Sequence, residues 1–329
     1  MAKRKLQLGI NLIPSMPVKE VIDTALVAEE LGFEYFFLAD EGFMQDVYVC
    51  LGTIAQQTSK MKLGPVTNGY TRHPVATAVA MATLNELSGG RAFITLIAGG
   101  SVVLAPMNIP REKPLLVLRE TVEVMRRMWT GEKVTWQGQR FQLNGAQISA
   151  GPAGDIPVWI APRGDKMLQV SGELGDGVLL MVKADLPAAF AIVDEAGAAS
   201  GRRPVRAYIE RIAYTPEMIR EAVSFFPHVL VDTPPRQLRG FLTEEEINRL
   251  QTAVTTGGAA AAEKLITPQM IKGYTIAGTP EECSVTLRQV VDENQLDVFV
   301  LNVVSAGFEG NVQKMKDAIS IIQEAEKLA

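Results

Sequence analysis

Three polar side chains stand where predicted β-strands end. Asp40 and Glu41 come directly after the apolar run EYFFLA, and Asn11 ends the run LQLGIN. The carboxyl ends of parallel strands form the rim at which barrel proteins bind ligands. A carboxylate there can exchange a proton with a ligand, whereas an amide can only form hydrogen bonds. Asp40 and Glu41 are therefore candidates for proton transfer, with a helix cap or a surface pair as the alternative; Asn11 is a candidate ligand contact or a polar residue satisfied within the barrel end.

Two glycine-rich segments follow two further predicted strands. Residues 64–69 read GPVTNG, in which Pro65 permits a cis peptide bond and the glycines permit unusual dihedral angles. A bulge there would press the backbone against a flat ring, and an ordinary strand-to-helix turn is the alternative. Residues 98–101 read AGGS, in which the glycines let the backbone approach a ligand and Ser101 can donate a hydrogen bond.

A basic turn joins the predicted strand PVWIA to the predicted helix KMLQVSGELG. Its sequence, APRGDK over residues 161–166, places Arg163, Gly164 and Lys166 at a helix start. Free N–H groups, the helix dipole and cationic side chains all favour an anion at such a position. We predict phosphate binding here, with a salt-bridged loop as the alternative.

The sequence offers no pattern for several other chemistries. It has no Ser/His/Asp arrangement, Walker loop or CxxC pair. Two histidines, His73 and His228, are too few for a His-rich metal centre, and no metal is expected. His73 precedes Pro74 and is predicted to cap or anchor a helix start. Cys50 and Cys283 are predicted to be reduced packing residues, as in a cytoplasmic protein.

Short apolar runs alternate with helical periodicities along the whole chain. The predicted strands are Leu6–Asn11, Tyr35–Ala39, Met61–Val66, Ala92–Ile97, Val158–Ala161, Gly177–Met181, Val205–Ile212 and Asp297–Leu301. The predicted helices include Val18–Leu31, Ala76–Leu87, Pro114–Trp129, Lys166–Leu174 and Asn311–Lys327. Eight strands separated by helices predict an α/β fold, a (β/α)8 TIM barrel. A doubly wound sheet is the alternative, although no GxGxxG follows the first strand.

Two segments exceed the simple repeat of strand and helix. Residues of about 132–150 alternate apolar and polar side chains around Gly138, which predicts an inserted hairpin. Residues 225–272 are predicted to form a polar helical insertion, broken at Pro234-Pro235 and Gly257-Gly258. An insertion of this length is either a functional lid or a packing and dimerisation appendage. No linker divides the chain, so residues 1–329 are predicted to form one domain.

The composition is that of a globular enzyme. Hydrophobic residues make up 47% and charged residues 21%, and the net charge is -5. This charge gives no electrostatic reason to expect a nucleic acid or an anionic membrane as partner. The N-terminal segment lacks the apolar region of a signal peptide, and no apolar run reaches the length of a bilayer span. We expect a cytoplasmic protein that acts on a small molecule.

Four strings carry a family resemblance over nearly the whole chain: LGPVTNGYTRHP, ATLNELSGGR, IPVWIAPRGDKMLQVSGELGDGV and YTIAGTPEECSVTLRQVV. With them the chain resembles the bacterial-luciferase-like superfamily, and within it the coenzyme F420-dependent methylenetetrahydromethanopterin reductases and related oxidoreductases. The resemblance implies a (β/α)8 barrel that often dimerises and holds its coenzyme at the carboxyl ends of the strands. It also implies a cis peptide bond behind the coenzyme ring, at Gly64-Pro65 or Pro65-Val66.

The resemblance also assigns residues to the coenzyme. Asp40 would lie near the deazaflavin ring, and Thr67 and Asn68 would touch the ring and its side chain. The basic turn would bind the phosphate. The full set implied for coenzyme binding is Asp40, Gly64, Pro65, Val66, Thr67, Asn68, Gly99, Gly100, Ser101, Pro162, Arg163, Gly164 and Lys166.

Three positions depart from the pattern of the family. Asn11 stands where methanopterin reductases have a glutamate, Glu41 where several relatives have a histidine, and Ser101 where an acid is frequent. Glu41 can replace the missing acid if burial raises its pKa. We therefore assign proton transfer to Asp40 and Glu41, and orientation of the substrate to Asn11 and Ser101.

Three functions follow as hypotheses. The first is a coenzyme F420-dependent oxidoreductase that moves a hydride between C5 of the deazaflavin and a small organic substrate. The second is an FMN-dependent luciferase-like monooxygenase, because the Arg163 turn suits the phosphate of either coenzyme. The third is a catalytically silent coenzyme-binding protein, because the three departures fall on proton-handling positions. A homodimer is expected from the resemblance.

Overall fold

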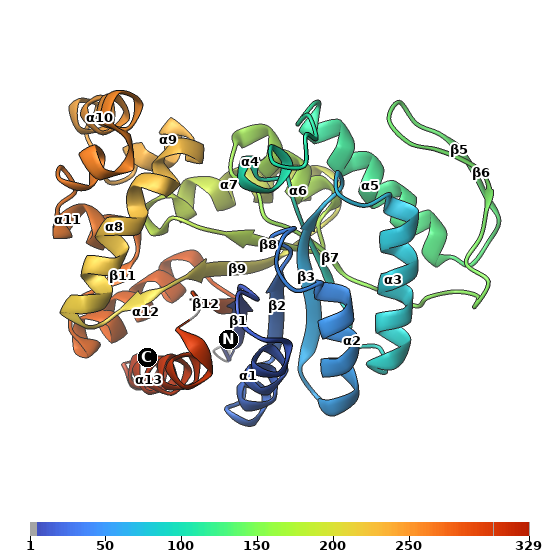
Figure 1. Ribbon diagram of the computed structural model, residues 1–329, viewed down its shortest axis with the longest axis horizontal. Helices are drawn as coiled ribbons and strands as arrows, with labels where there is room; N and C mark the ends of the chain where they lie inside the picture. Colours follow the sequence, from blue (N-terminus) through green and yellow to red (C-terminus); the bar gives the residue numbers. More distant parts are fainter. Residues whose placement is uncertain (1–4, 305, 329) are drawn as a thin grey trace.

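The computed structural model describes residues 5–304 and 306–328 and contains a closed barrel of eight parallel strands (Figure 1). The strands follow one another around the barrel in the order β1-β12-β9-β8-β7-β4-β3-β2. Their bounds are β1 (Gln7–Leu12), β2 (Tyr35–Ala39), β3 (Lys62–Asn68), β4 (Ile94–Ile97), β7 (Val158–Ile160), β8 (Gly177–Leu180), β9 (Val205–Glu210) and β12 (Val298–Val303). Because β1 pairs with both β2 and β12, the sheet closes, which confirms the (β/α)8 barrel and excludes the open doubly wound sheet.

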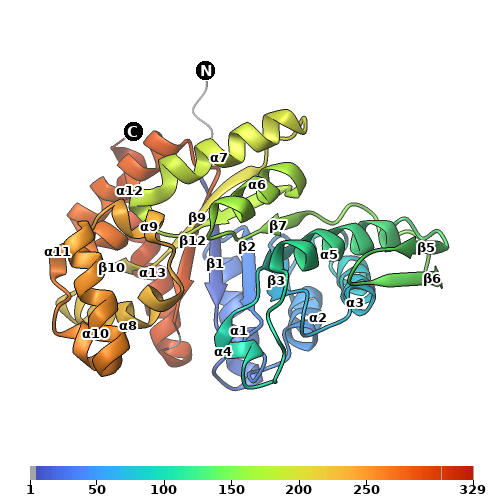
Figure 2. The same cartoon turned by 90° about the horizontal axis from the view of Figure 1, so that it is seen from above.

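Helices surround the barrel on its outside (Figures 1 and 2). Those that connect successive barrel strands, or follow the last one, are α1 (Val18–Glu30), α2 (Val47–Gln57), α3 (Pro74–Leu87), α5 (Pro114–Trp129), α6 (Asp165–Leu174), α7 (Leu186–Ala199), α12 (Pro280–Asn294) and α13 (Gly307–Lys327). The short helix α4 (Ser101–Leu104) lies before α5, and a 3-10 turn η1 (Lys183–Asp185) lies before α7. Successive side chains of a strand point to opposite faces of the sheet, so each strand has an outward set of side chains. The helices pack their apolar stripes against this outward set.

Aromatic side chains close the inside of the barrel. Tyr35, Phe37, Phe93 and Trp159 point inward and form one buried cluster with smaller aliphatic side chains. Their ring centroids lie 4.8 Å apart for Phe37 and Phe93 and 5.3 Å apart for Tyr35 and Trp159. Tyr35 begins β2, Phe93 precedes β4, and Phe37 and Trp159 lie in the middle of their strands, so these rings form a floor below the carboxyl ends. A ligand must therefore bind above this floor, at the rim.

The segment predicted as a ring-facing loop is part of a strand. The strand predicted over Met61–Val66 is present as β3 and runs on to Asn68, so the expectation of a bulged loop over residues 64–68 is wrong. The predicted cis bond at Gly64-Pro65 or Pro65-Val66 is also wrong, because no peptide bond among the described residues is cis. A Cβ atom on Gly64 would lie 2.2 Å from the carbonyl oxygen of Phe93. Glycine is needed at this position because the backbone at Phe93, directly before β4, lies too close for a side chain.

The predicted hairpin is present and is held by one buried carboxylate. Strands β5 (Val134–Gln137) and β6 (Gln142–Ala146) pair antiparallel beyond α5. Glu120 of α5 accepts hydrogen bonds from the backbone N–H groups of Gln139 at 2.6 Å, Arg140 at 2.9 Å and Phe141 at 2.9 Å. The hairpin is thereby fixed on the side of the barrel opposite the helical insertion (Figure 2).

The helical insertion lies between β9 and β12 and begins earlier than predicted. It consists of β10 (Ile212–Ala213), α8 (Pro216–Asp232), α9 (Pro235–Arg239), α10 (Glu244–Glu263), α11 (Pro268–Tyr274) and β11 (Ile276–Ala277). The predicted start at residue 225 was too late because α8 begins at Pro216, capped by the Thr215 side chain. The predicted breaks are present: α8 ends before Pro234, and Gly258 is non-helical within α10. These elements bury an apolar cluster of their own, including Phe226, against the barrel edge.

Among the described residues, no helix combines the length and the apolarity needed to cross a lipid bilayer.

We expect Glu120→Ala to lower the free energy of unfolding by about 1.5–3 kcal/mol, because three backbone N–H groups lose a charged acceptor. The matched control is Glu123→Ala on the same helix, whose carboxylate forms an exposed pair with Arg127 and should contribute about 0.5 kcal/mol or less. Urea unfolding of both variants measures the difference. Equal losses of stability would show that Glu120 does not anchor the hairpin.

Candidate active site

The barrel brings most of the predicted site residues to one rim. Asp40 follows β2, Thr67 and Asn68 end β3, and Arg163 follows β7. Asn11 lies near the end of β1. Since all eight strands run parallel, these carboxyl ends lie at the same end of the barrel. The rim therefore combines carboxylates, amides and a cationic turn around the aromatic floor.

Asp40 is held in place by the neighbouring strand. Its backbone N–H donates to the carbonyl of Val66 at 2.9 Å, and its Oδ2 accepts from the Thr67 hydroxyl at 2.7 Å. Burial, assisted by the charge of Asp40, raises the pKa of Tyr48 to about 12, so this tyrosine stays protonated at neutral pH. The structure thus orients the Asp40 carboxylate and makes Thr67 its positioning partner.

Glu41 has the properties of a proton-exchanging group. Its side chain is half-buried. Burial raises the pKa of Glu41, and the adjacent negative charge of Asp40 raises it further. Two neighbouring carboxyls with different surroundings can divide the roles of anion and acid between them.

Asn11 on the first strand is hydrogen-bonded to a residue of the last strand. Its Nδ2 donates to Oδ1 of Asn302 at 2.9 Å, and the two residues are paired in register on β1 and β12. Asn11 is buried, whereas Asn302 is partly exposed and lines a cavity beside the rim. The amide that can reach a ligand there is therefore Asn302, which Asn11 orients.

Two predicted ligand contacts serve the local backbone. The side-chain oxygen of Asn68 accepts from the N–H groups of Tyr70 at 2.8 Å and Thr71 at 3.0 Å, which fixes the turn after β3. Gly99 has φ +83°, and a Cβ atom there would lie 2.8 Å from Leu104. Ser101 is exposed and is the first residue of α4, which Gly100 precedes as its N-cap residue. This loop belongs to the rim, and its own packing requires a glycine at position 99, whereas a Cβ atom on Gly100 would lie in open space.

The basic turn after β7 keeps donors open for an anion. Gly164 is the N-cap residue of α6, so the first N–H groups of that helix point out of its start. The Arg163 guanidinium contacts the sulfur of Met181 at 4.0 Å, and among the described residues no carboxylate forms an ion pair with it. Asp165, which could repel an anion, is paired with Arg236 at 2.6 Å. Lys166 is exposed on the first turn. These features suit a phosphate group.

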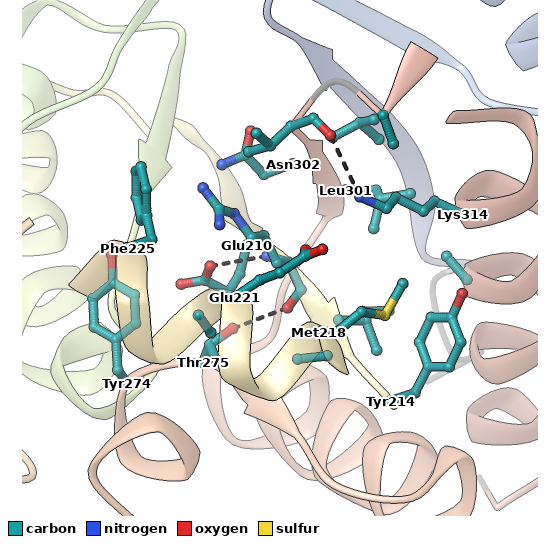
Figure 3. Close-up of a pocket in the computed structure, with 18 of the residues that line it drawn as sticks. Glu210, Tyr214, Met218, Glu221, Phe225, Tyr274, Thr275, Leu301, Asn302 and Lys314 are labelled. Atoms are coloured by element: carbon teal, nitrogen blue, oxygen red, sulfur yellow. Dashed lines mark hydrogen bonds between the residues drawn. The ribbon is translucent and has the colours of Figure 1, made fainter. Parts of the chain in front are cut away.

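Beside the rim lies a cavity that the sequence analysis missed (Figure 3). It has a volume of about 450 Å3 and lies between the ends of β9 and β12 on one side and helices α8 and α13 on the other. Apolar side chains line most of it, among them Met218, Phe225 and Leu301. Figure 3 shows Phe225 and Tyr274 on one side of this space and Tyr214 and Lys314 on the opposite side.

Two charged residues line this cavity at the end of β9, Glu210 as its last residue and Arg211 directly after it. Glu210 is fully buried; one carboxylate oxygen accepts from the Arg211 N–H at 2.9 Å, and the other has no hydrogen-bond partner among the described residues. Burial raises the pKa of Glu210 to about 7, against the opposing effects of the Arg211 backbone and the nearby cations Arg211 and Lys183. The sequence signal was the pair Glu-Arg inside the apolar run VRAYIERIA, which the predicted strand Val205–Ile212 absorbed.

Comparison with known proteins finds a luciferase-like family and coenzyme F420-dependent enzymes among its relatives. The sequence model of the family described as luciferase-like monooxygenase matches residues 5–293. A 5,10-methylenetetrahydromethanopterin reductase of Archaeoglobus fulgidus is 35% identical over 297 residues, which cover 84% of this chain and 87% of that protein. The structure of a coenzyme F420-dependent tetrahydromethanopterin reductase from Methanopyrus kandleri superposes with a TM-score of 0.84 at 26% identity, covering 94% of this chain and 97% of that one. An F420-dependent secondary alcohol dehydrogenase shares the fold, with a TM-score of 0.76 at 20% identity, over 97% of this chain and 99% of that one.

We expect Glu210→Gln to remove a pH-dependent loss of stability. The pKa of Glu210 is higher in the folded state than its ordinary value of 4.5, so the folded state binds the proton more tightly. The free energy of unfolding of the wild type should therefore fall as pH rises from about 5 to about 7 and then level off. The free energy of unfolding of Glu210→Gln minus that of the wild type should therefore be about 2–3 kcal/mol larger at pH 8 than at pH 5.

Urea unfolding at pH 5 and pH 8 measures this difference. Glu217→Gln, at an exposed position of α8, is the matched control and should change stability equally at both pH values. Parallel pH profiles for the wild type and Glu210→Gln would contradict the raised pKa.

Proposed function

The chain belongs to the luciferase-like monooxygenase family, and on that premise we propose that it is a coenzyme F420-dependent oxidoreductase acting on a small organic substrate. The observation that carries the proposal is the turn at Arg163 and Gly164, which presents open donors for a phosphate at the rim of a barrel closely similar to an F420-dependent reductase. The 35% identity to a methylenetetrahydromethanopterin reductase extends over most of both chains. These features favour the deazaflavin branch of the family.

The residues at the rim fit such a coenzyme. Bound F420 supplies hydride exchange at C5 of its deazaflavin ring. Arg163, Lys166 and the start of α6 would hold the phosphate of its side chain. The aromatic floor offers an apolar surface beneath a flat ring and excludes water from below. The protein therefore contributes position and a dry environment.

Proton handling falls to the carboxyls of the rim. Asp40, oriented by Thr67, would hold a polar edge of the ring. Glu41, whose pKa burial raises, would exchange a proton with coenzyme or substrate. The amide pair Asn11–Asn302 would orient the substrate from β1 and β12, the strands that follow β2 around the rim. Ser101, at the start of α4, would contact the substrate from the loop after β4.

A second candidate is an FMN-dependent monooxygenase. The matched family is described as luciferase-like monooxygenase, and the turn at Arg163 and Gly164 also suits the phosphate of FMN. A silent coenzyme-binding protein would bind the coenzyme and fail to turn over a broad panel of pterins, alkenes and ketones.

We expect the purified protein to bind F420 with micromolar affinity and to bind FMN more weakly. Arg163→Ala should weaken F420 binding roughly tenfold or more, because the phosphate loses a charge-assisted hydrogen bond. Arg119→Ala, which removes an exposed arginine paired with Glu173 on α5 and α6, should leave the affinity unchanged. Quenching of F420 fluorescence in titrations gives the F420 affinities of the wild type and the two variants, and quenching of FMN fluorescence gives the affinity for FMN. Saturation by FMN without any response to F420 would overturn the proposal, and oxygen consumption with reduced FMN would then support the monooxygenase.

We also propose that the chain works as a single-domain homodimer in the cytoplasm. Exposed apolar side chains on one outer face support the dimer: Val49 of α2 is 69% exposed, and Val79 and Leu87 of α3 are 43% and 41% exposed. Leu87 lies beside Gly52 of α2, one turn from Val49, so the two helices present a common apolar face. Both cysteines are free and buried, which suits a reducing compartment.

Val49→Glu should convert a dimer to a monomer, because a carboxylate would be buried unpaired in the interface. Val285→Glu on α12, at a position 56% exposed, is the matched control and should leave the mass unchanged. Sedimentation equilibrium gives the masses. A wild-type protein that is monomeric at all concentrations would disprove the dimer.

A further inference from the structure

We propose that the cavity beside the rim binds an apolar small molecule that carries a carboxylate or another anionic group, and that Arg211 recognises this group. The proposal rests on the proposed function only in naming that molecule as the substrate. Neither the family match nor the similar proteins' descriptions assign a role to Arg211 or to this space.

The Arg211 side chain is partly buried and has no ion-pair partner within the part of the chain that the structure describes. Its guanidinium carbon lies 4.2 Å from the ring centroid of Phe225, so the side chain is stacked and held in one orientation. Burial lowers the pKa of Arg211, and the nearby carboxylates of Glu210 and Glu221 raise it. No carboxylate among the described residues lies within ion-pair distance of its nitrogens, although Glu210 and Glu221 line the same cavity. Five N–H donors in a rigid plane match a carboxylate in a bidentate geometry.

The backbone of Arg211 is held as well as its side chain. The Thr275 hydroxyl donates to the Arg211 carbonyl at 2.9 Å, and the Arg211 N–H donates to Glu210 (Figure 3). Thr275 lies between α11 and β11, so the insertion itself fixes the end of β9. A charged side chain on a fixed backbone is preorganised for binding, which lowers the entropy cost of recognition.

The rest of the cavity suits an apolar body. Most of its lining is aliphatic or aromatic, and its volume of about 450 Å3 is that of a site for a small organic ligand. Asn302 lines the cavity and pairs with Asn11 at the rim, so the cavity reaches the residues that we assign to the reaction. A ligand anchored at Arg211 would thus extend from the cavity toward the coenzyme.

Protonation of Glu210 removes a negative charge from the cavity, so an anionic ligand binds beside Arg211 more favourably. Glu210 faces Arg211 and Lys183 as cations and Tyr208 and Tyr274 as neutral phenols, and Glu221 of α8 is the other carboxylate at the cavity. Lys314 of α13 adds a second cation to the lining, with its Nζ donating to the Val304 carbonyl at 3.5 Å. When Glu210 is neutral, the cavity lining carries the two positive charges of Arg211 and Lys314 and the one negative charge of Glu221. A ligand with one negative charge then neutralises the lining.

The anion could also belong to the coenzyme side chain, since Arg163 lies against Met181, which lines the same cavity. The test separates the two sources. Its probes are 2-naphthoate and the uncharged 2-naphthamide, which have the same apolar body. Isothermal titration at pH 6.5 without coenzyme should give roughly tenfold to hundredfold tighter binding of 2-naphthoate, the value of a charge-assisted hydrogen bond. Arg211→Gln should abolish this preference, and Arg211→Lys should keep a smaller part of it.

Two controls place the effect. Arg249→Gln, at an exposed position of α10, should keep the full preference for 2-naphthoate. Ala222→Phe, which adds a ring to the cavity lining, should weaken the binding of both probes alike. Equal binding of the two probes by the wild type, or an unchanged preference in Arg211→Gln, would overturn the proposal.

The coenzyme arm uses F420 and the same deazaflavin without its phosphate-bearing side chain. Arg211→Gln should leave the affinities for both unchanged. A loss of F420 affinity alone, together with an unchanged preference for 2-naphthoate, would assign Arg211 to the coenzyme and overturn the proposal. Failure of the proposed function is distinct, because a protein that binds no F420 would still discriminate between the two naphthyl probes.

Discussion

The closure of the sheet between β1 and β12 is the constraint on which the rest of the structure depends. It pairs the first strand with the last and places Asn11 opposite Asn302, 291 positions away, within one hydrogen bond. Once the sheet is closed, every strand has two neighbours and every carboxyl end lies on one rim. The aromatic side chains inside then form a floor, so that polar groups can be collected only above it. The rim is therefore a consequence of closure, and its chemistry depends on which residues end the strands.

The helical insertion adds a second level to this arrangement. The connection from β9 to β12 contains the helix α12, as the other connections contain a helix, and also the insertion. The insertion brings a separate apolar cluster and the backbone contact from Thr275. The result is a cavity beside the rim and a fully buried Glu210, one of whose oxygens has no hydrogen-bond partner in the described part of the chain. A buried carboxyl of this kind lowers stability at alkaline pH, which is typical of groups retained for a role in a site.

Local sequence signals predicted the elements well wherever the apolar pattern was uninterrupted. Pro114–Trp129 agrees at both ends, and the first strand deviates by one residue. The glycine and proline of residues 64–69 misled the prediction, because these residue types are typical of turns. The predicted strand Met61–Val66 already contained Gly64 and Pro65, but β3 continues without a bulge to Asn68, and the carbonyl of Phe93 leaves no room for a side chain at position 64. The reason lies in the distance between two strands, which a single segment does not contain.

The amino-acid sequence by itself determined the fold class and the residues that end the strands. Periodicity and turn residues specify alternating strands and helices, and residue types specify that Asp40, Glu41 and the Arg163 turn are polar groups at strand ends. Only the tertiary structure decided which of them have partners. It gave Asp40 its hydrogen bond from Thr67 and tied Asn11 to Asn302. It also left Arg211 at the wall of a cavity, with no carboxylate of the described residues in an ion pair with it. Burial and pairing depend on contacts between residues far apart in the chain, and no local pattern encodes those distances.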